Sequence, residues 1–81
     1  MGFKPRDGNQ VIAGIPWLAR MIDKARAKAE GRLGDYIYPC VRDQRLLAEL
    51  GLTAEKFSRI VVESDDDRAV INRIHPNYRR Q

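Results

Sequence analysis

The chain has 81 residues, 43% of them hydrophobic and 32% charged, with one Cys, one His and a net charge of +4. This composition excludes a disordered chain, and the length allows one domain that buries only about 60–65% of its unfolded surface, which argues against a deep internal active site. A single Cys excludes an internal disulfide and a zinc site made of several cysteines, so packing must stabilise the core.

The first half of the chain divides into an arm, a helix and a connector. Residues 1–12 show no period and are rich in turn-forming residues, so we expect a flexible arm. The spacing of apolar residues predicts a first helix over residues 16–30, with Pro16 at its first position and Gly31 as its stop. Residues 33–38 favour a strand but are too few for a sheet, so we expect a short extended connector.

Two shorter helices are predicted after the connector. The second begins near residues 39–41 and ends at Leu50, because Gly51 is a typical C-terminal stop. The third begins after Thr53, a good N-cap residue, and ends near Glu63.

A fourth helix is predicted near the end of the chain. Ser64 is expected to cap it, and His75 and Pro76 are expected to close it, which leaves residues 77–81 as a basic tail. These elements predict an all-α fold in a single domain over residues 1–81. Its architecture is expected to be a compact three- to four-helix orthogonal array, with the extended connector between the first two helices.

Two motifs in order resemble a known family. They are IPWLARMIDKARA at residues 15–27 and LGDYIYPC at residues 33–40, followed by Asp43 and Gln44. Over about residues 14–57, the chain resembles the bacterial domain-of-unknown-function family 5069. The resemblance implies a small helical bacterial protein and names no activity.

The polar residues of the predicted first helix form one candidate binding site. Arg20, Asp23, Lys24 and Arg26 lie off or beside its apolar arc. Three cations around one carboxylate can hold a phosphate or carboxylate ligand, with Asp23 fixing the geometry of the arginines. The alternatives are a solvated helix face with weak i,i+3 ion pairs, and a packing face for the connector, since the small residues Ala19 and Ala27 flank Asp23.

A second cluster spans the connector and the start of the predicted second helix, and it contains Asp35, Tyr36, Tyr38, Cys40, Asp43 and Gln44. A Cys at a helix start can act as a thiolate nucleophile, but the only His lies far along the chain, and a free Cys is more often a small buried residue. Asp43 suits the third position of a capped helix, which explains it without a function. Tyr36 and Tyr38 lie on one side of an extended segment, where they line a groove or cover the core.

Metal, cofactor and membrane binding are not expected. Residues 65–67 are three consecutive Asp, which lack the spacing of a calcium loop and suit helix capping better. No phosphate-binding or dinucleotide-binding motif is present. The N-terminal residues lack the apolar stretch of a signal peptide, and with a single Cys this predicts a cytoplasmic location.

The net charge is unevenly distributed. Residues 1–34 carry seven cations and three anions, residues 35–67 carry four and eight, and residues 68–81 carry four and none. The acidic middle of the chain would repel a polyanion, so nucleic-acid binding is disfavoured. The cations available for it are Arg73, Arg79, Arg80 and those of the first helix.

We therefore hypothesise a non-enzymatic binding module. Its binding surface combines the first helix with the connector from Tyr36 to Gln44, and its partner is a protein or a small anionic ligand. The alternatives are a small ligand-binding or enzymatic domain that uses Cys40, Asp23 or Asp43, and a weak nucleic-acid binder that uses the basic ends.

Overall fold

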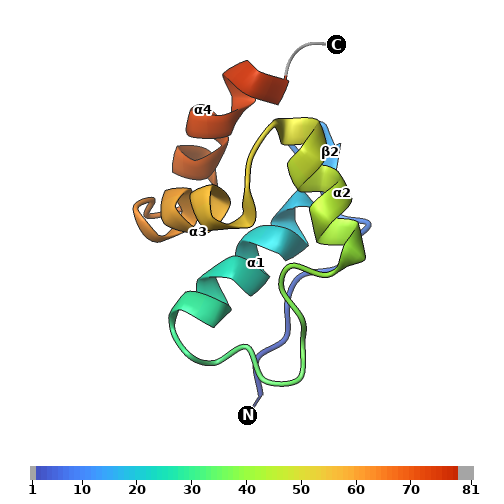
Figure 1. Ribbon diagram of the computed structural model, residues 1–81, viewed down its shortest axis with the longest axis vertical. Helices are drawn as coiled ribbons and strands as arrows, with labels where there is room; N and C mark the ends of the chain where they lie inside the picture. Colours follow the sequence, from blue (N-terminus) through green and yellow to red (C-terminus); the bar gives the residue numbers. More distant parts are fainter. Residues whose placement is uncertain (1, 79–81) are drawn as a thin grey trace.

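A two-strand hairpin precedes four helices (Figure 1). This computed structural model describes the backbone of residues 2–78 and the side chains of residues 2–74. α1 contacts the hairpin and α3, and α2 contacts both α3 and α4. The elements are β1 (Val11–Ile12), β2 (Ile15–Pro16), α1 (Leu18–Ala29), α2 (Val41–Leu50), α3 (Ala54–Val62) and α4 (Asp67–Tyr78).

The hairpin corrects the expectation of an all-α fold. Ile12 pairs with Ile15 in antiparallel register, and the two residues between them, Ala13 and Gly14, have φ values of 53° and 75°. Positive φ at both central residues is the geometry of a tight type I′ turn. Pro16 therefore lies on a strand and not in the first turn of a helix. An edge strand tolerates a residue that has no backbone N–H. The protein is mostly helical but not strictly all-α, and the orthogonal crossing of its helices stays a prediction.

α1 begins directly after a tryptophan in the left-handed backbone region. Trp17 has a φ of 75°, which costs a residue with a side chain roughly 1–2 kcal/mol, and its N–H donates to the Gly8 carbonyl at 2.9 Å. At the other end, the Arg32 N–H donates to the Ala27 carbonyl at 2.9 Å, past a Gly31 with a φ of 73°. The predicted stop at Gly31 is therefore confirmed.

The caps of α2 and α3 also follow the local sequence signals. α2 ends at Leu50 before Gly51, which has a φ of 72°, as predicted. The Thr53 hydroxyl accepts the Lys56 N–H at 3.1 Å and caps α3, also as predicted.

α4 differs from the prediction at both ends. The Ser64 hydroxyl donates to the Ile60 carbonyl at 2.6 Å, and the carboxylate of Asp66 accepts the Ala69 N–H at 3.0 Å, so Asp66 and not Ser64 caps the helix. The predicted closure at His75 and Pro76 is wrong, because α4 runs to Tyr78.

A proline inside a helix removes one hydrogen bond and its ring crowds the carbonyl four residues back, but its φ is helical, so the chain can continue as a helix past it, as α4 does. The expected tail over residues 77–81 is therefore wrong for its first two residues, which belong to α4. Its other residues, 79–81, lie outside the described part of the chain.

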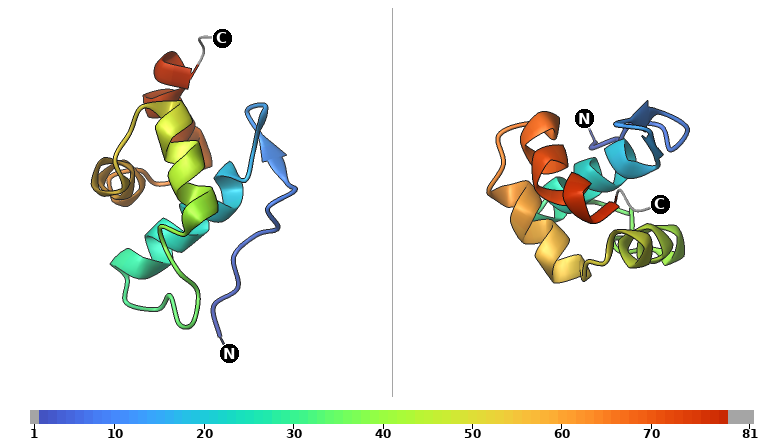
Figure 2. Two further views of the ribbon diagram at one scale, coloured as in Figure 1. Left: turned by 45° about the vertical axis from the view of Figure 1, so that its right-hand side comes forward. Right: turned by 90° about the horizontal axis from the view of Figure 1, so that it is seen from above.

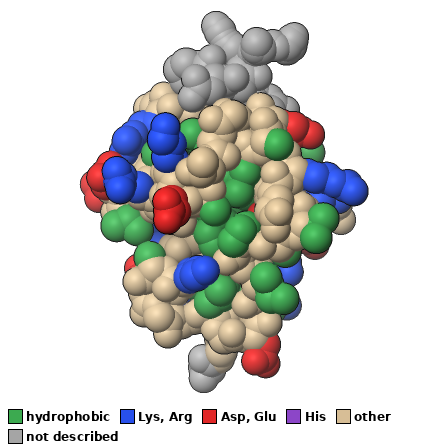
Figure 3. Space-filling view, in the orientation of Figure 1, with side chains coloured by type: hydrophobic (Ala, Val, Ile, Leu, Met, Phe, Trp, Pro, Cys, Tyr) green, Lys and Arg blue, Asp and Glu red, His purple; other side chains and the backbone are tan. Residues whose placement is uncertain are grey.

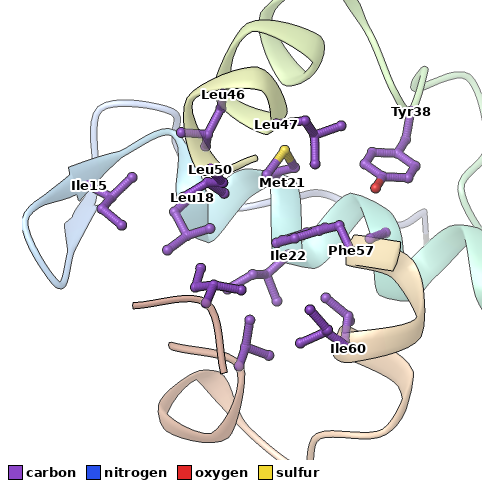
Figure 4. Packing of buried hydrophobic residues seen from close by; sticks show 14 residues of the cluster. Ile15, Leu18, Met21, Ile22, Tyr38, Leu46, Leu47, Leu50, Phe57 and Ile60 are labelled. Carbon is purple, nitrogen blue, oxygen red and sulfur yellow. The ribbon is translucent and has the colours of Figure 1, made fainter. Parts of the chain in front are cut away.

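One apolar cluster joins the hairpin and all four helices (Figure 4). Met21 of α1 lies beside Leu47 of α2, Ile22 lies beside Phe57 of α3, and the Phe57 side chain is fully buried. Burial of each such side chain contributes about 1.5–3 kcal/mol. None of the described helices is long and apolar enough to cross a membrane. The buried residues of the apolar cluster are Ile15, Leu18, Met21, Ile22, Ala25, Tyr38, Leu46, Leu47, Leu50, Phe57, Ile60, Val61, Val70 and Ile74.

Candidate functional site

The polar residues of α1 bind separate partners and do not form one anion site. Asp23 binds Arg6, Lys24 binds Asp43, and the Arg26 guanidinium donates to the Ser64 carbonyl at 3.3 Å. Arg20 donates to the backbone carbonyl of Arg6 at 3.1 Å. The structure therefore places these side chains in structural contacts with other segments, and the cluster of three cations around Asp23 is not observed.

Arg6 joins the N-terminal segment to α1 and α4. Its guanidinium donates to both Asp23 oxygens at 2.9 Å and to the two Asp67 oxygens at 2.6 and 3.0 Å, and its backbone N–H also donates to Asp23 at 2.8 Å. These contacts raise the pKa of the Arg6 guanidinium and, mainly through the Arg6 hydrogen bond, lower the pKa of the Asp67 carboxyl. We call Arg6, Asp23 and Asp67 the Arg6 clamp.

The Arg6 clamp corrects the expectation of a flexible arm. The N-terminal segment runs beside α1 in both views of Figure 2, and Pro5 is buried. The small residues beside Asp23, Ala19 and Ala27, are fully buried, and the Ala19 carbonyl accepts from Arg6 at 3.3 Å. This side of α1 is therefore a packing face, but the N-terminal segment, and not the connector as predicted, packs against it.

A buried ion pair holds α1, the connector and the start of α2 together. The Lys24 ammonium lies 2.8 Å from an Asp43 oxygen, and only 4% of the Lys24 side chain and none of the Asp43 side chain is exposed. Lys24 also donates to the Ile37 carbonyl at 2.9 Å and to the Cys40 sulfur at 3.4 Å, while Asp43 accepts the Trp17 indole N–H at 2.7 Å. Asp43 also accepts the Cys40 backbone N–H, so each of the two charges has three polar partners. A buried charge needs such partners to offset its loss of hydration.

Cys40 is the N-cap of α2. Its sulfur accepts the Asp43 N–H at 3.4 Å, and the Asp43 carboxylate accepts the Cys40 N–H at 3.0 Å, which completes a capping box. The capping role predicted for Asp43 is confirmed. Chemistry at Cys40, Asp23 or Asp43 stays a prediction, although the capping box and the two ion pairs account for these side chains structurally.

The two connector tyrosines have different environments. Tyr38 is 5% exposed, and its hydroxyl donates to the Ala54 carbonyl at 3.1 Å; burial raises the pKa of this phenol. Tyr36 is half-buried on the surface, 5.6 Å from the Phe3 ring in an edge-to-face pair. The connector contains two turns, at residues 34–35 and 38–39, so the two rings do not line one groove.

A row of aromatic rings and arginines crosses the surface formed by the N-terminal segment, α1, the connector and α2. The Arg20 guanidinium lies 5.6 Å from the Tyr36 ring centroid and 5.4 Å from the Trp17 ring centroid. At the other end of this row, the Arg42 guanidinium lies 4.8 Å from the Trp17 ring centroid. At the Phe3 end, Arg32 lies 5.5 Å from the ring. We call Phe3, Trp17, Arg20, Arg32, Tyr36 and Arg42 the aromatic–arginine surface.

Of the predicted site residues, only Arg20 and Tyr36 belong to the aromatic–arginine surface. Gln44 lies outside it, exposed, with its amide donating to the Pro39 carbonyl at 3.4 Å. The residues that sequence reasoning missed are Phe3, Arg6, Trp17, Arg32 and Arg42. They lie on four separate segments, so no local spacing signals their proximity.

Charges of both signs are distributed over the molecule. On the face shown in Figure 3, hydrophobic side chains lie near the centre, and Lys and Arg side chains are interspersed with Asp and Glu. Arg73, one of the cations available for the disfavoured nucleic-acid binding, pairs with Glu63 at 2.8 Å, and the two tail arginines lie beyond the described residues. Within the described residues, no three His, Cys, Asp or Glu side chains gather as metal ligands.

Comparison with known proteins identifies one family. A family model described as "Domain of unknown function (DUF5069)" matches residues 3–81, so the match extends well beyond the two motifs in the first half of the chain. No curated protein matches the chain.

Proposed function

The chain belongs to the DUF5069 family, whose description assigns no function, so we propose one from the geometry of its own side chains: it is a non-enzymatic binding module for an acidic protein partner. The partner binds the aromatic–arginine surface. This surface includes the exposed side of α1 and the beginning of the connector, but it extends to the N-terminal segment and to Arg42 of α2.

The observation that carries the proposal is the unbroken contact between three aromatic rings and three arginines. Trp, Tyr and Arg are the residues most often found at the energetic centres of protein interfaces, because they bring large contact area together with directed hydrogen bonds. Cation–π contact also holds each guanidinium over a ring, so less side-chain entropy is lost when a partner binds.

The charge of this surface favours an acidic partner. Within residues 2–74, neither Arg20 nor Arg42 has a carboxylate within ion-pair distance, whereas Arg32 pairs with Glu30 at 2.6 Å. Two cations without ion-pair partners on an otherwise aromatic surface complement a segment that combines carboxylates with apolar side chains.

The test is quantitative affinity capture from lysate of the source cells with four variants. Arg20→Gln and Tyr36→Ala alter the aromatic–arginine surface, while Arg68→Gln and Val62→Ala are matched controls at exposed positions on α4 and α3. Far-UV circular dichroism and thermal unfolding establish that all four variants fold.

We expect one partner to be retained by the wild type and both controls and to be depleted at least tenfold by R20Q and Y36A. A truncated partner peptide should then show the same ranking in solution. Equal capture by all variants would show that this surface is not the binding site. A partner whose capture is abolished by nuclease, with a steep salt dependence, would assign the surface to nucleic acid instead.

A further inference from the structure

A groove lies between β2 and α2, beside Trp17. Its volume is about 340 Å³, near the lower limit for pockets that bind small molecules, which begin at about 300 Å³. One wall consists of Ile15, Pro16 and Trp17, and the other of α2 side chains. The α2 residues are Arg42, Arg45, Leu46 and Glu49, which recur on one face of the helix.

Part of the groove's lining is apolar. The Ile15 and Leu46 side chains are 1% and 6% exposed, so they belong to the core and offer a small contact area, and Trp17 adds an aromatic wall. A ligand with an apolar body can pack against this wall.

The rim of the groove carries two guanidinium groups and one carboxylate. Among the described side chains, Arg42, Arg45 and Glu49 have no ion-pair partner within 4.0 Å. The Arg42 guanidinium is placed at the groove by its contact with the Trp17 ring at 4.8 Å. Guanidinium groups bind carboxylates through paired hydrogen bonds, and the Glu49 charge leaves the rim with a net charge of one positive unit.

We propose that this groove binds a small carboxylic acid with an apolar or aromatic body, its carboxylate between Arg42 and Arg45 and its body against Trp17, Leu46 and Ile15. A dianion is disfavoured because Glu49 repels the second charge, and a neutral ligand leaves the guanidinium groups unused. The volume fits a ligand of about one aromatic ring with a short acid chain. The groove adjoins the partner surface and shares Trp17 and Arg42 with it, but Arg45, Leu46 and Glu49 belong to the groove alone.

Three probes of similar size test the proposal: phenylacetate, its neutral analogue phenylacetamide, and phenyl phosphate. The chain has one Trp, so the fluorescence of Trp17 and its indole N–H signal in a nitrogen–proton NMR spectrum both report on this groove. We expect a saturable response to phenylacetate, with a dissociation constant on the order of 1 mM or lower. Phenylacetamide should bind at least tenfold more weakly.

Two variants in the groove and one control locate the site. Arg45→Gln should weaken phenylacetate binding about tenfold because it removes a charge-assisted hydrogen bond, and Glu49→Gln should tighten it about threefold because it removes a repulsive charge. Arg68→Gln, an exposed cation on α4, should leave the affinity unchanged.

The proposal is overturned if phenylacetamide binds as tightly as phenylacetate, if R45Q and R68Q have equal effects, or if no response saturates. Tighter binding of phenyl phosphate than of phenylacetate would overturn the carboxylate assignment. Because R45Q leaves the aromatic–arginine surface intact and R20Q leaves the groove intact, failure of this proposal and failure of the partner proposal are distinguishable.

Discussion

Replacing Lys24 with Met tests whether the buried ion pair maintains the fold. The substitution keeps most of the volume and the apolar stem of the side chain but removes the ammonium, so Asp43 stays fully buried without its opposite charge. Removal of one partner from a buried pair costs about 3–5 kcal/mol. Because Asp43 keeps hydrogen bonds from the Trp17 indole and the Cys40 backbone, we expect the lower end, about 3 kcal/mol.

That loss is large for a protein of this size. At roughly 0.05–0.15 kcal/mol per residue, an 81-residue domain has a total stability of about 4–12 kcal/mol. A loss of about 3 kcal/mol should therefore lower Tm by about 12–24 °C, and a wild type at the low end of this range would keep only about 1 kcal/mol in the variant, so roughly one molecule in six would be unfolded at 25 °C.

The assay is urea unfolding followed by Trp17 fluorescence and far-UV circular dichroism. Lys28→Met is the matched control: the same substitution one helical turn later, at an exposed lysine whose ammonium donates to the Tyr38 carbonyl at 3.1 Å, should cost less than about 1 kcal/mol. An Asp43→Asn variant completes a double-mutant cycle with Lys24→Met, and we expect a coupling energy of about 2 kcal/mol.

Two results would refute the reasoning. If Lys24→Met costs no more than Lys28→Met, the ammonium is not needed where the structure places it. If the two substitutions of the pair are additive within about 0.5 kcal/mol, Lys24 and Asp43 do not interact.

Three further substitutions address the rest of the structure. Asp67→Asn should destabilise the protein by about 0.5–1 kcal/mol at neutral pH. Because Arg6 lowers the Asp67 pKa, the difference in stability between the wild type and this variant should shrink as the pH falls below 3.8 in acid-unfolding measurements. A difference that persists at that pH would contradict the Arg6 clamp. Tyr38→Phe should cost about 1–2 kcal/mol in urea unfolding at neutral pH. Because the pKa of the Tyr38 phenol is raised in the folded protein, the wild type should lose stability above pH 10 relative to the variant. Equal stability of the two proteins at neutral pH would argue against the buried hydroxyl contact. Gly8→Ala should cost about 1–3 kcal/mol and shift the Trp17 emission, because a β-carbon at Gly8 would overlap the indole ring; an unchanged spectrum and Tm would contradict this packing.

Local signals in the sequence predicted where α1 and α2 end and where α3 begins. Gly31, Gly51 and Thr53 work through backbone groups within a few residues, so their effects are visible in the sequence alone. The helical spacing of Met21 and Phe57 likewise predicts burial, because one turn of helix repeats in the sequence.

The features that sequence reasoning missed depend on residues far apart in the chain. Arg6 and Asp67 are separated by 61 positions, and Lys24 lies at the edge of its helix face, where a lysine is normally solvated. The hairpin was missed because its strands are two residues long and its turn places a non-glycine residue, Ala13, at positive φ. The residues of the aromatic–arginine surface are also far apart in the chain, so their spacing in the sequence does not predict that surface.

The Arg6 clamp also has a consequence for how the protein opens. One guanidinium closes a loop that spans most of the chain, so the N-terminal segment and α4 cannot detach independently without leaving charges unpaired. Local fluctuation of α4 should therefore be transmitted to the first residues, and amide protons at both ends should exchange with solvent as one cooperative unit. A truncation that removes residues 1–6 would thus loosen the last helix, although that helix is encoded at the opposite end of the gene.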